Sequence, residues 1–140
     1  MVYLDTSALV PLFVREPKSE AVLGWISSSQ APLAVSEWSF VEFASATSIK
    51  VRTGQISAHI ADQAGAHLEA FAREHCQVAA PGRAAFRLAA ELARKPTPGL
   101  RAGDALHLAI ALNLKAGTLL CLDDAMIAVA CSLGLHAPQL

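Results

Sequence analysis

The sequence has no apolar run that approaches the ~18 residues needed to cross a membrane. Its N-terminus, MVYLDTSALV, has neither the basic start nor the small-residue cleavage site of a secretory signal. These absences argue against a membrane or secreted protein. We therefore expect a cytoplasmic protein that does not associate with a membrane.

Cysteine is also scarce. The three cysteines, Cys76, Cys121 and Cys131, form no CxxC pair. An odd count without that spacing argues against a disulfide framework and against a zinc site. We expect all three thiols to be reduced.

The motifs of several common α/β proteins are missing. No glycine-rich loop that could cradle a phosphate is present, which argues against a nucleotide-binding protein. A haloacid-dehalogenase-like phosphatase needs a second Asp two residues after the first, where Ser7 stands. A receiver domain needs a pair of acids after its first strand, where only Asp5 is found.

Charged residues make up only 16% of the chain, whereas hydrophobic residues make up 54%. Such a composition excludes a disordered chain and predicts a well-filled core. The length of 140 residues fits a single domain that spans residues 1–140.

The net charge of −1 argues against a general polyanion-binding protein. Between residues 83 and 101, however, positive side chains predominate, and Glu91 is the only acid. A local basic face can hold a phosphate backbone even on a nearly neutral chain. The alternative is a solvated helix face followed by a basic loop. The candidate RNA contacts are Arg83, Arg87, Lys95 and Arg101.

Short apolar segments alternate with helical patterns along the chain. The expected strands are 2–4, 33–35, 76–80 and 118–122, with a short fifth strand at 135–137. Strands separated by helices predict βαβ units, a mostly parallel sheet, and helices on both faces. The expected fold is therefore a three-layer αβα sandwich. In the helix expected at 83–94, the inward residues should be Phe86, Ala90 and Ala93.

Acids occur where two of these strands end. Asp5 follows the first strand, and Asp123 follows the fourth, with Asp124 behind it. In open α/β sheets, ligands bind beyond the carboxyl ends of the strands. Each acid also has a structural alternative, because Asp5 can form an Asx turn, Asp123 can cap a helix and Asp124 can stabilise a first turn.

Two more acids lie in apolar surroundings. Glu42 is inside WSFVEFASA, and Asp104 begins DALHLAIAL. A buried acid is unfavourable unless something neutralises it. Glu42 can pair with a basic residue on a neighbouring helix, and Asp104 can complement a helix dipole. If both converge with Asp5 and Asp123, pairs ~4 Å apart repel by about 4 kcal/mol at an effective dielectric of ~20. Such a cluster requires protons or a cation, and oxygen ligands suit Mg²⁺ or Mn²⁺.

Other polar residues near these acids have simple structural interpretations. His107 lies one turn after Asp104 and is more typical of a hydrogen-bonded core residue than of a metal ligand. Trp25 and Trp38 are more typical of packing groups than of base-stacking platforms. Thr6 and Ser7 can cap a helix, and either can also hold an Asp5 oxygen.

Four segments together resemble the motifs of PIN domains. LDTSALV resembles the opening motif, SEWSFVEFASA the second, GDALHLAIAL the third, and LLCLDDAMIAVACSLGL the fourth. They occur in the family's order between residues 3 and about 135. The resemblance implies metal-dependent RNA cleavage, and it makes Asp5, Glu42, Asp104 and Asp123 the acidic metal ligands, with Ser7 as a supporting group.

The resemblance extends to the VapC-like toxins, which are most of the compact bacterial members. It implies an endoribonuclease toxin of a toxin–antitoxin pair, a small cognate antitoxin, a homodimer and an RNA substrate such as tRNA. The alternative is a PIN-like module that has lost catalysis and only binds RNA or protein. The helix pair from Glu37 to Arg73 should form the dimer or antitoxin surface. One departure is Cys121, where the family usually has Thr or Ser, and its loss of a hydroxyl could loosen Asp123.

Overall fold

Four short strands form one sheet in which all neighbours are parallel. The computed structural model describes residues 1–96 and 99–140, so part of the loop expected at 95–103 lies outside the described residues. The strand order is β3-β2-β1-β4, with bounds Cys76–Ala79, Leu33–Ser36, Val2–Leu4 and Thr118–Leu120. The predicted strand at 135–137 is reduced to an isolated bridge between Thr118 and His136.

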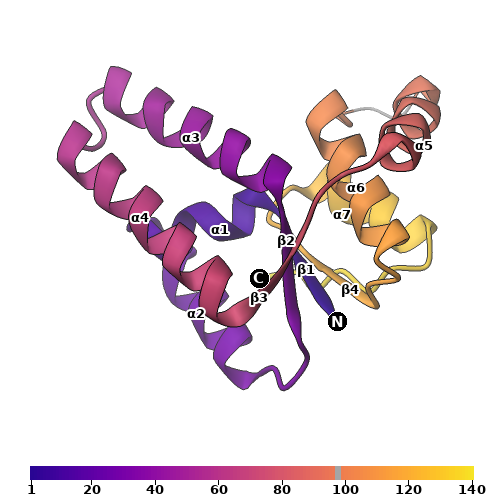
Figure 1. The fold of residues 1–140 in the computed structure, drawn as a ribbon, viewed down its shortest axis with the longest axis horizontal. Coiled ribbons are helices and arrows are strands. Elements are labelled where there is room, and N and C mark those ends of the chain that lie inside the picture. Colours follow the sequence, from indigo (N-terminus) through magenta and orange to yellow (C-terminus); the bar gives the residue numbers. More distant parts are fainter. Residues whose placement is uncertain (97–98) are drawn as a thin grey trace.

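Seven helices among the described residues connect and flank these strands. They are α1 (Thr6–Phe13), α2 (Ser19–Ser28), α3 (Glu37–Arg52), α4 (Ala58–His75), α5 (Arg83–Arg94), α6 (Ala102–Asn113) and α7 (Asp124–Ser132). Figure 1 shows α1 to α4 on one side of the sheet and α5 to α7 on the other. The predicted three-layer αβα sandwich is therefore confirmed. No helix in the described part of the chain is long and apolar enough to cross a membrane.

The central strand β1 separates two apolar cores. Successive side chains of a strand point to opposite faces. Tyr3 accordingly packs in the core beneath α5, α6 and α7, whereas Val2 and Leu4 pack in the core beneath α1 to α4. All three side chains are almost completely buried, which is typical of a parallel strand covered on both faces. Asp5 follows directly and therefore emerges between the two cores.

Helix α5 has the predicted bounds, but the residues that it buries are not the predicted ones. Ala85, Ala89 and Leu92 are buried, whereas Phe86 is 54% exposed. The expectation that Phe86, Ala90 and Ala93 point inward is therefore wrong. Helix α5 packs on α6, and small side chains at this contact allow the two helices to approach closely. Phe86, Ala90 and Ala93, which the α5–α6 contact does not bury, instead line an apolar hollow that Trp38 also lines.

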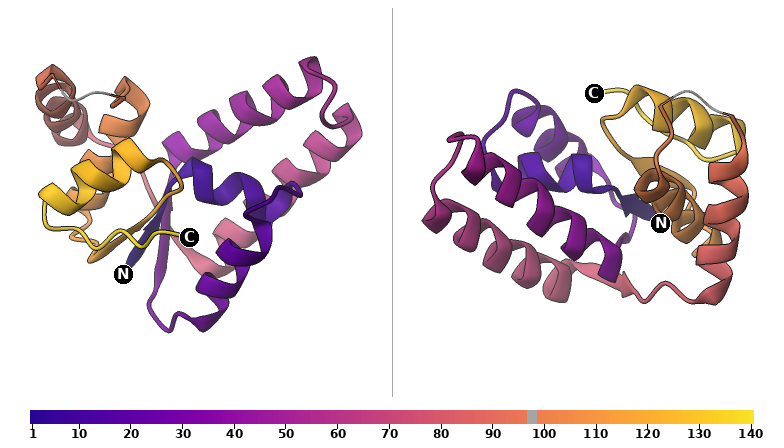
Figure 2. Two further views of the ribbon diagram at one scale, coloured as in Figure 1. Left: turned by 180° about the vertical axis from the view of Figure 1, so that it is seen from behind. Right: turned by 90° about the horizontal axis from the view of Figure 1, so that it is seen from above.

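Helices α3 and α4 form an antiparallel pair that extends away from the sheet, as Figure 1 and Figure 2 show. A capping box at Ser36 begins α3, and the Ser57 side chain caps α4 by accepting from the amide of Ile60. Between them, Gly54 adopts a φ of 73°, which glycine tolerates without strain. Helix α3 thus leaves the sheet at the carboxyl edge, which carries the acids, and α4 returns to the opposite edge, where β3 begins.

Candidate metal-binding active site

The structure brings the four sequence-identified acids together in one pocket of about 370 Å³ at the carboxyl edge of the sheet. They come from four different elements. Asp5 follows β1, Glu42 lies in the second turn of α3, Asp104 in the first turn of α6, and Asp123 precedes α7. Because β1 and β4 are neighbours in the sheet, the acids after them emerge side by side.

Two hydrogen bonds from Ser7 hold the Asp5 carboxylate in place. Its Oδ2 atom accepts hydrogen bonds from the amide and the hydroxyl of Ser7, at 2.9 and 2.5 Å. The same hydroxyl accepts from the amide of Leu122 at 2.8 Å. Ser7 therefore ties the carboxylate after β1 to the chain that leaves β4. The bond from the Ser7 amide is that of the Asx turn predicted for Asp5, and it coexists with the place of Asp5 in the pocket. It also makes Asp5 the N-cap of α1, so the prediction that Thr6 or Ser7 caps this helix is wrong.

Asp104 and Asp123 both stabilise helix N-termini with a single oxygen. Oδ2 of Asp104 accepts from the amide of Arg101 at 2.8 Å, and Oδ1 of Asp123 accepts from the amide of Met126 at 2.9 Å. The second oxygen of each carboxylate makes no protein hydrogen bond within residues 1–96 and 99–140. The cap suggested for Asp123 and the first-turn position suggested for Asp104 are therefore present, and they leave one oxygen of each acid available in the pocket.

Glu42 is restrained at both of its oxygens. Oε2 accepts from Thr6 Oγ1 at 3.1 Å and lies 2.7 Å from His107 Nε2. Oε1 faces Gly103, where an added Cβ would lie only 2.2 Å away. Burial tends to raise the pKa of Glu42, but the hydrogen bonds from His107 and Thr6 outweigh burial and leave the pKa below its usual value. Glu42 is therefore ionised, and its partner on a neighbouring helix is a histidine.

His107 is the site residue that the sequence interpretation underestimated. Its side chain is completely buried, and Nδ1 lies 2.8 Å from the Tyr3 hydroxyl. Its prediction as a hydrogen-bonded core residue is confirmed, yet Nε2 also contacts Glu42 and lies 3.4 Å from Asp5 Oδ1. The signal was present in the sequence, because residues three apart on a helix share a face, and His107 is three residues after Asp104.

Negative charge accumulates in the pocket. Burial raises the pKa of Asp104, and the nearby charges of Asp5, Asp123 and Glu42 raise it further. Arg101 is the one basic residue that lines the pocket among the described residues. A cation would relieve this repulsion, and four carboxylates provide the hard oxygen donors that Mg²⁺ and Mn²⁺ prefer. Among the described residues, Asp5, Glu42 and His107 have candidate ligand atoms within 4.8 Å of one another, whereas Asp104 and Asp123 line the same pocket without joining a group at this spacing. In chemical kind, the carboxylate donors fit a divalent ion.

The remaining candidates occupy different surroundings. Arg83 and Arg87 are exposed on α5, and Lys95 borders a separate hollow beside α7, so only Arg101 of the predicted RNA contacts reaches the acids. Asp124 is exposed in the first turn of α7 and does not line the pocket.

Cys121 lies in the apolar core, where its thiol is also close to the backbone of Asp123. All three cysteines are free, as predicted. Cys121 is completely buried, and burial raises its thiol pKa to about 12. Asp123 takes its orientation from the amide of Met126. The missing hydroxyl at position 121 therefore leaves this restraint on Asp123 in place.

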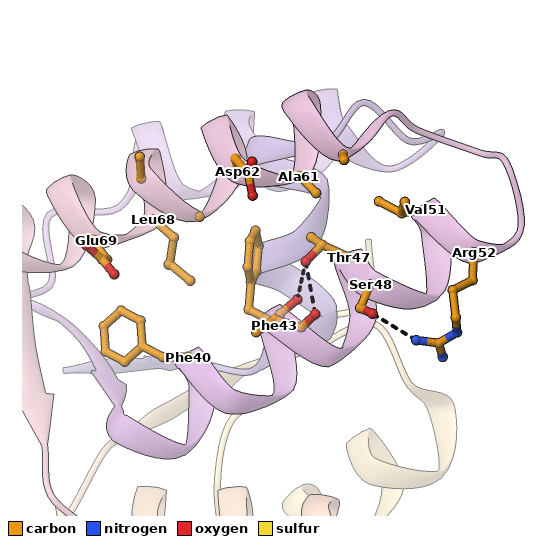
Figure 3. A pocket seen from close by; sticks show the side chains of 14 residues that line it. Phe40, Phe43, Thr47, Ser48, Val51, Arg52, Ala61, Asp62, Leu68 and Glu69 are labelled. Carbon is orange, nitrogen blue, oxygen red and sulfur yellow. Dashed lines mark hydrogen bonds between the residues drawn. The ribbon is translucent and has the colours of Figure 1, made fainter.

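A larger hollow of about 630 Å³ lies between α3 and α4, which we call the α3–α4 groove. Figure 3 shows Phe40, Phe43 and Leu68 facing this space from the two helices. Charged side chains at Arg52 and Glu69 also line it. The groove belongs to the segment from Glu37 to Arg73 that the sequence marked as an interaction surface.

Comparison with known proteins places these features in a family. The sequence model of the PIN-domain family matches residues 2–131 of this chain. Structural neighbours include the Mycobacterium tuberculosis toxin VapC20, which is described as cleaving the sarcin–ricin loop (16% identity, TM-score 0.75, 92% of this chain and 95% of that chain). VapBC2 from Rickettsia felis, bound to promoter DNA, has 16% identity and a TM-score of 0.67 over 100% of this chain and 99% of that chain.

A third neighbour is FitAcB from Neisseria gonorrhoeae, with 14% identity and a TM-score of 0.68 over 98% of this chain and 96% of that chain. At these identities the neighbours establish a shared fold. A comparison with curated protein sequences found no significant match.

Proposed function

Because this chain belongs to the PIN-domain family, whose members are nucleases, we propose that it is a metal-dependent endoribonuclease and the toxin of a toxin–antitoxin pair. The observation that carries the proposal is the convergence of Asp5, Glu42, Asp104 and Asp123 on one pocket. Burial and the charges of the neighbouring carboxylates raise the pKa of Asp104 there, and a cation would relieve the repulsion. The toxin assignment is supported by structural neighbours that are described as toxins or toxin–antitoxin complexes.

The four acids would hold Mg²⁺ or Mn²⁺ through their available oxygens. When bound, the ion would supply Lewis acidity toward an attacking water and toward the phosphate oxygens. Ser7 keeps the Asp5 carboxylate in place, while Thr6 and His107 keep the Glu42 carboxylate in place. Attack by water, rather than by the ribose 2′-hydroxyl, leaves a 5′-phosphate and a 3′-hydroxyl.

RNA would approach along the side of the pocket that Arg101 lines. Arg101 borders the acids and is positioned to contact a phosphate next to the scissile bond. Arg83, Arg87 and Lys95 lie farther out and would contact neighbouring phosphates, which adds affinity without sequence preference. The proposed substrate class is structured cellular RNA, with tRNA as one candidate.

Mapping of 5′-phosphate ends in cellular RNA tests this function directly. The protein is induced in a bacterium that lacks the antitoxin, with the Asp5→Asn variant as the control. Asn keeps the size and capping ability of Asp5 but removes the charge. A few new ends that are absent in the control are expected.

Equal end maps from two soluble, equally expressed proteins would favour the alternative of an inactive binding module. Titration with Mn²⁺ separates the two functions further. An active site should bind Mn²⁺, whereas an inactive module that has lost its site should not.

We further propose that the antitoxin places an amphipathic helix in the α3–α4 groove. Amphipathic helices commonly bind other proteins by placing their apolar face in a hydrophobic groove. Ala44 is exposed and lines the groove, so Ala44→Glu should block the helix without disturbing the core. Co-purification with the antitoxin should be lost in this variant. Ala21→Glu, at an exposed position of α2, is the matched control and should retain the partner.

A homodimer remains part of the proposal. Val41 on α3 and Phe86 on α5 are 57% and 54% exposed, and large apolar side chains at such exposure are candidates for cover by a second copy. Light scattering at micromolar concentration should give the mass of two chains. The mass of one chain would contradict the dimer and leave the nuclease assignment unaffected.

A further inference from the structure

A continuous chain of buried polar groups connects the middle of the sheet to the acidic pocket. The Ser36 hydroxyl at the end of β2 lies 2.8 Å from the Tyr3 hydroxyl on β1. Tyr3 lies 2.8 Å from His107 Nδ1 on α6, and His107 Nε2 lies 2.7 Å from Glu42 on α3. Ser36, Tyr3 and His107 have no exposed surface.

The direction of the hydrogen bonds follows from Glu42. An ionised carboxylate can only accept, so the atom 2.7 Å from its Oε2 must donate, and His107 Nε2 therefore carries a proton. In a neutral ring Nδ1 is then the acceptor and receives the Tyr3 hydroxyl proton. Burial raises the pKa of Tyr3, which keeps that proton in place. Ser36 completes the chain by donating to the Tyr3 oxygen.

The opposite tautomer gives a poorer arrangement. If Nε2 had no proton, it would offer a lone pair to a metal ion, as its proximity to Asp5 and Glu42 would permit. Nδ1 would then donate to Tyr3, and two acceptors, Nε2 and Oε2, would face each other at 2.7 Å. Such a pair repels, and the single hydroxyl proton of Thr6, whose Oγ1 lies 3.2 Å from Nε2 and 3.1 Å from Oε2, would be shared between the two acceptors.

We propose that Ser36 and Tyr3, acting through His107, are positioning residues for Glu42, and that His107 Nε2 donates a hydrogen bond to this carboxylate instead of binding the metal. The proposal rests on the proposed function because it concerns the same acidic pocket. Outer-shell hydrogen bonds of this kind orient ligands and adjust their affinity for metal. Close contact with Gly103 restrains the other oxygen, so Glu42 is held in one orientation before any ion arrives.

The first test is the protonation pattern of His107, measured by nitrogen-15 NMR of the histidine side chains in the full chain. The His107 signals are assigned by their loss in His107→Gln. We expect Nε2 to carry a proton in the metal-free protein and to keep it on titration with Mg²⁺. A ring protonated only at Nδ1, or an Nε2 that loses its proton when Mg²⁺ binds, would overturn the proposal.

The second test is Mn²⁺ affinity, measured by calorimetry without RNA. His107→Leu should weaken binding about 10- to 100-fold, as loss of an outer-shell partner usually does. His107→Gln should recover most of this loss, because its amide can donate to Glu42. Tyr3→Phe removes only the hydroxyl and should weaken binding about 3- to 10-fold, the range of a single neutral hydrogen bond.

A matched control removes a hydroxyl elsewhere. Ser19→Ala deletes a partly buried, hydrogen-bonded hydroxyl at the start of α2 and should leave Mn²⁺ affinity and the His107 signals unchanged. Wild-type affinity in Tyr3→Phe, or equal losses in His107→Gln and His107→Leu, would refute the positioning role. Tyr3→Phe keeps the test decisive if His107→Leu does not fold.

The outcome is separable from that of the proposed function. A protein that shows the protonated Nε2 and binds Mn²⁺ but cleaves no RNA would refute the ribonuclease and retain the positioning role. A protein that cleaves RNA but has unchanged Mn²⁺ affinity in Tyr3→Phe would do the reverse.

Discussion

Gly103 leaves no room for a side chain beside Glu42. A Cβ there would meet the tip of the Glu42 side chain, which can move aside while the backbone stays in place. Gly103→Ala should therefore fold normally and displace Glu42, weakening Mn²⁺ binding by about 10-fold or more. Calorimetry measures the affinity, and circular dichroism checks the fold.

The matched control for this substitution is Gly24→Ala, because an added Cβ at Gly24 meets nothing within 4 Å. This change inside α2 should leave Mn²⁺ affinity unaltered and stabilise the helix by about 0.5–1 kcal/mol. Wild-type affinity in Gly103→Ala would show that Glu42 does not need its observed position.

Asp104 should destabilise the metal-free protein at neutral pH. Burial and its charged neighbours raise its pKa, so the native state holds this proton more tightly than the unfolded chain. The resulting stability is present at low pH and is lost as pH rises through the folded pKa. Asp104→Asn removes the charge, and it should raise the Tm of the metal-free protein by about 1–3 °C at neutral pH.

Thermal denaturation across the acidic and neutral range measures this effect. The gain should shrink toward low pH, where Asp104 is already protonated in the native protein. Glu42 acts in the opposite sense, because its lowered pKa adds stability at neutral pH that is lost as pH falls through the folded value. A lower Tm for Asp104→Asn at neutral pH would contradict the repulsion.

At the scale of single residues, the sequence identified the acids but not the groups that restrain them. Asp5 and Asp123 could be predicted because strand ends of a parallel sheet meet at one edge. Glu42 could be predicted because an acid in an apolar run needs a partner. His107 and Gly103 could not be assigned in the same way, because their roles depend on the close approach of α6 to α3.

Helix α7 and the acidic site share a single side chain. Asp123 caps the helix and lines the pocket, so its two roles can be separated by substitution. Asp123→Asn should keep the cap and lose cleavage, whereas Asp123→Ala should lose cleavage and about 1 kcal/mol of stability. Urea denaturation and an RNA cleavage assay measure the two effects.

Asp124→Asn is the neighbouring control for this pair, because Asp124 lies in the first turn but neither caps α7 nor lines the pocket. Both properties should stay close to those of the wild type. Equal stability of Asp123→Asn and Asp123→Ala would show that the Asp123 side chain contributes no cap.

At the scale of elements, helix bounds were more predictable than helix faces. The bounds of α5 agree with the prediction because Gly82 and Lys95 flank a continuous run of helix-forming residues. Its inward face was mispredicted because an alanine-rich helix offers two apolar stripes. The stripe with Phe86 is the more hydrophobic, but the stripe with Ala85 and Ala89 fits against α6.

For the whole molecule, metal binding should be linked to folding. The pocket forms only in the native state, so bound Mg²⁺ stabilises that state, by about 2.7 kcal/mol at 100 times its dissociation constant. Protons compete for the carboxylates, and the increase in Tm should be larger at about pH 8 than at about pH 5. Differential scanning fluorimetry measures the shift, and Asp5→Asn is the control. An equal shift in that variant would place the ion elsewhere.

The overall architecture could be predicted from the sequence because its signals are local. Short apolar strands, helix caps and strand-end acids each occupy a few adjacent residues, and together they specify a parallel sheet with helices on both faces. The α3–α4 groove could be predicted only as a region, because its shape depends on how the two helices of the pair pack against each other.

Three acids of the site also hold backbone amides, and this has an evolutionary consequence. Asn caps as well as Asp does, and every Asp codon becomes an Asn codon through a change of its first base. Under the proposed function, selection against cleavage therefore has single-base routes to a folded, inactive protein at Asp5, Asp104 and Asp123. Asn at these positions in a related chain would then indicate a protein that has kept its fold after losing cleavage.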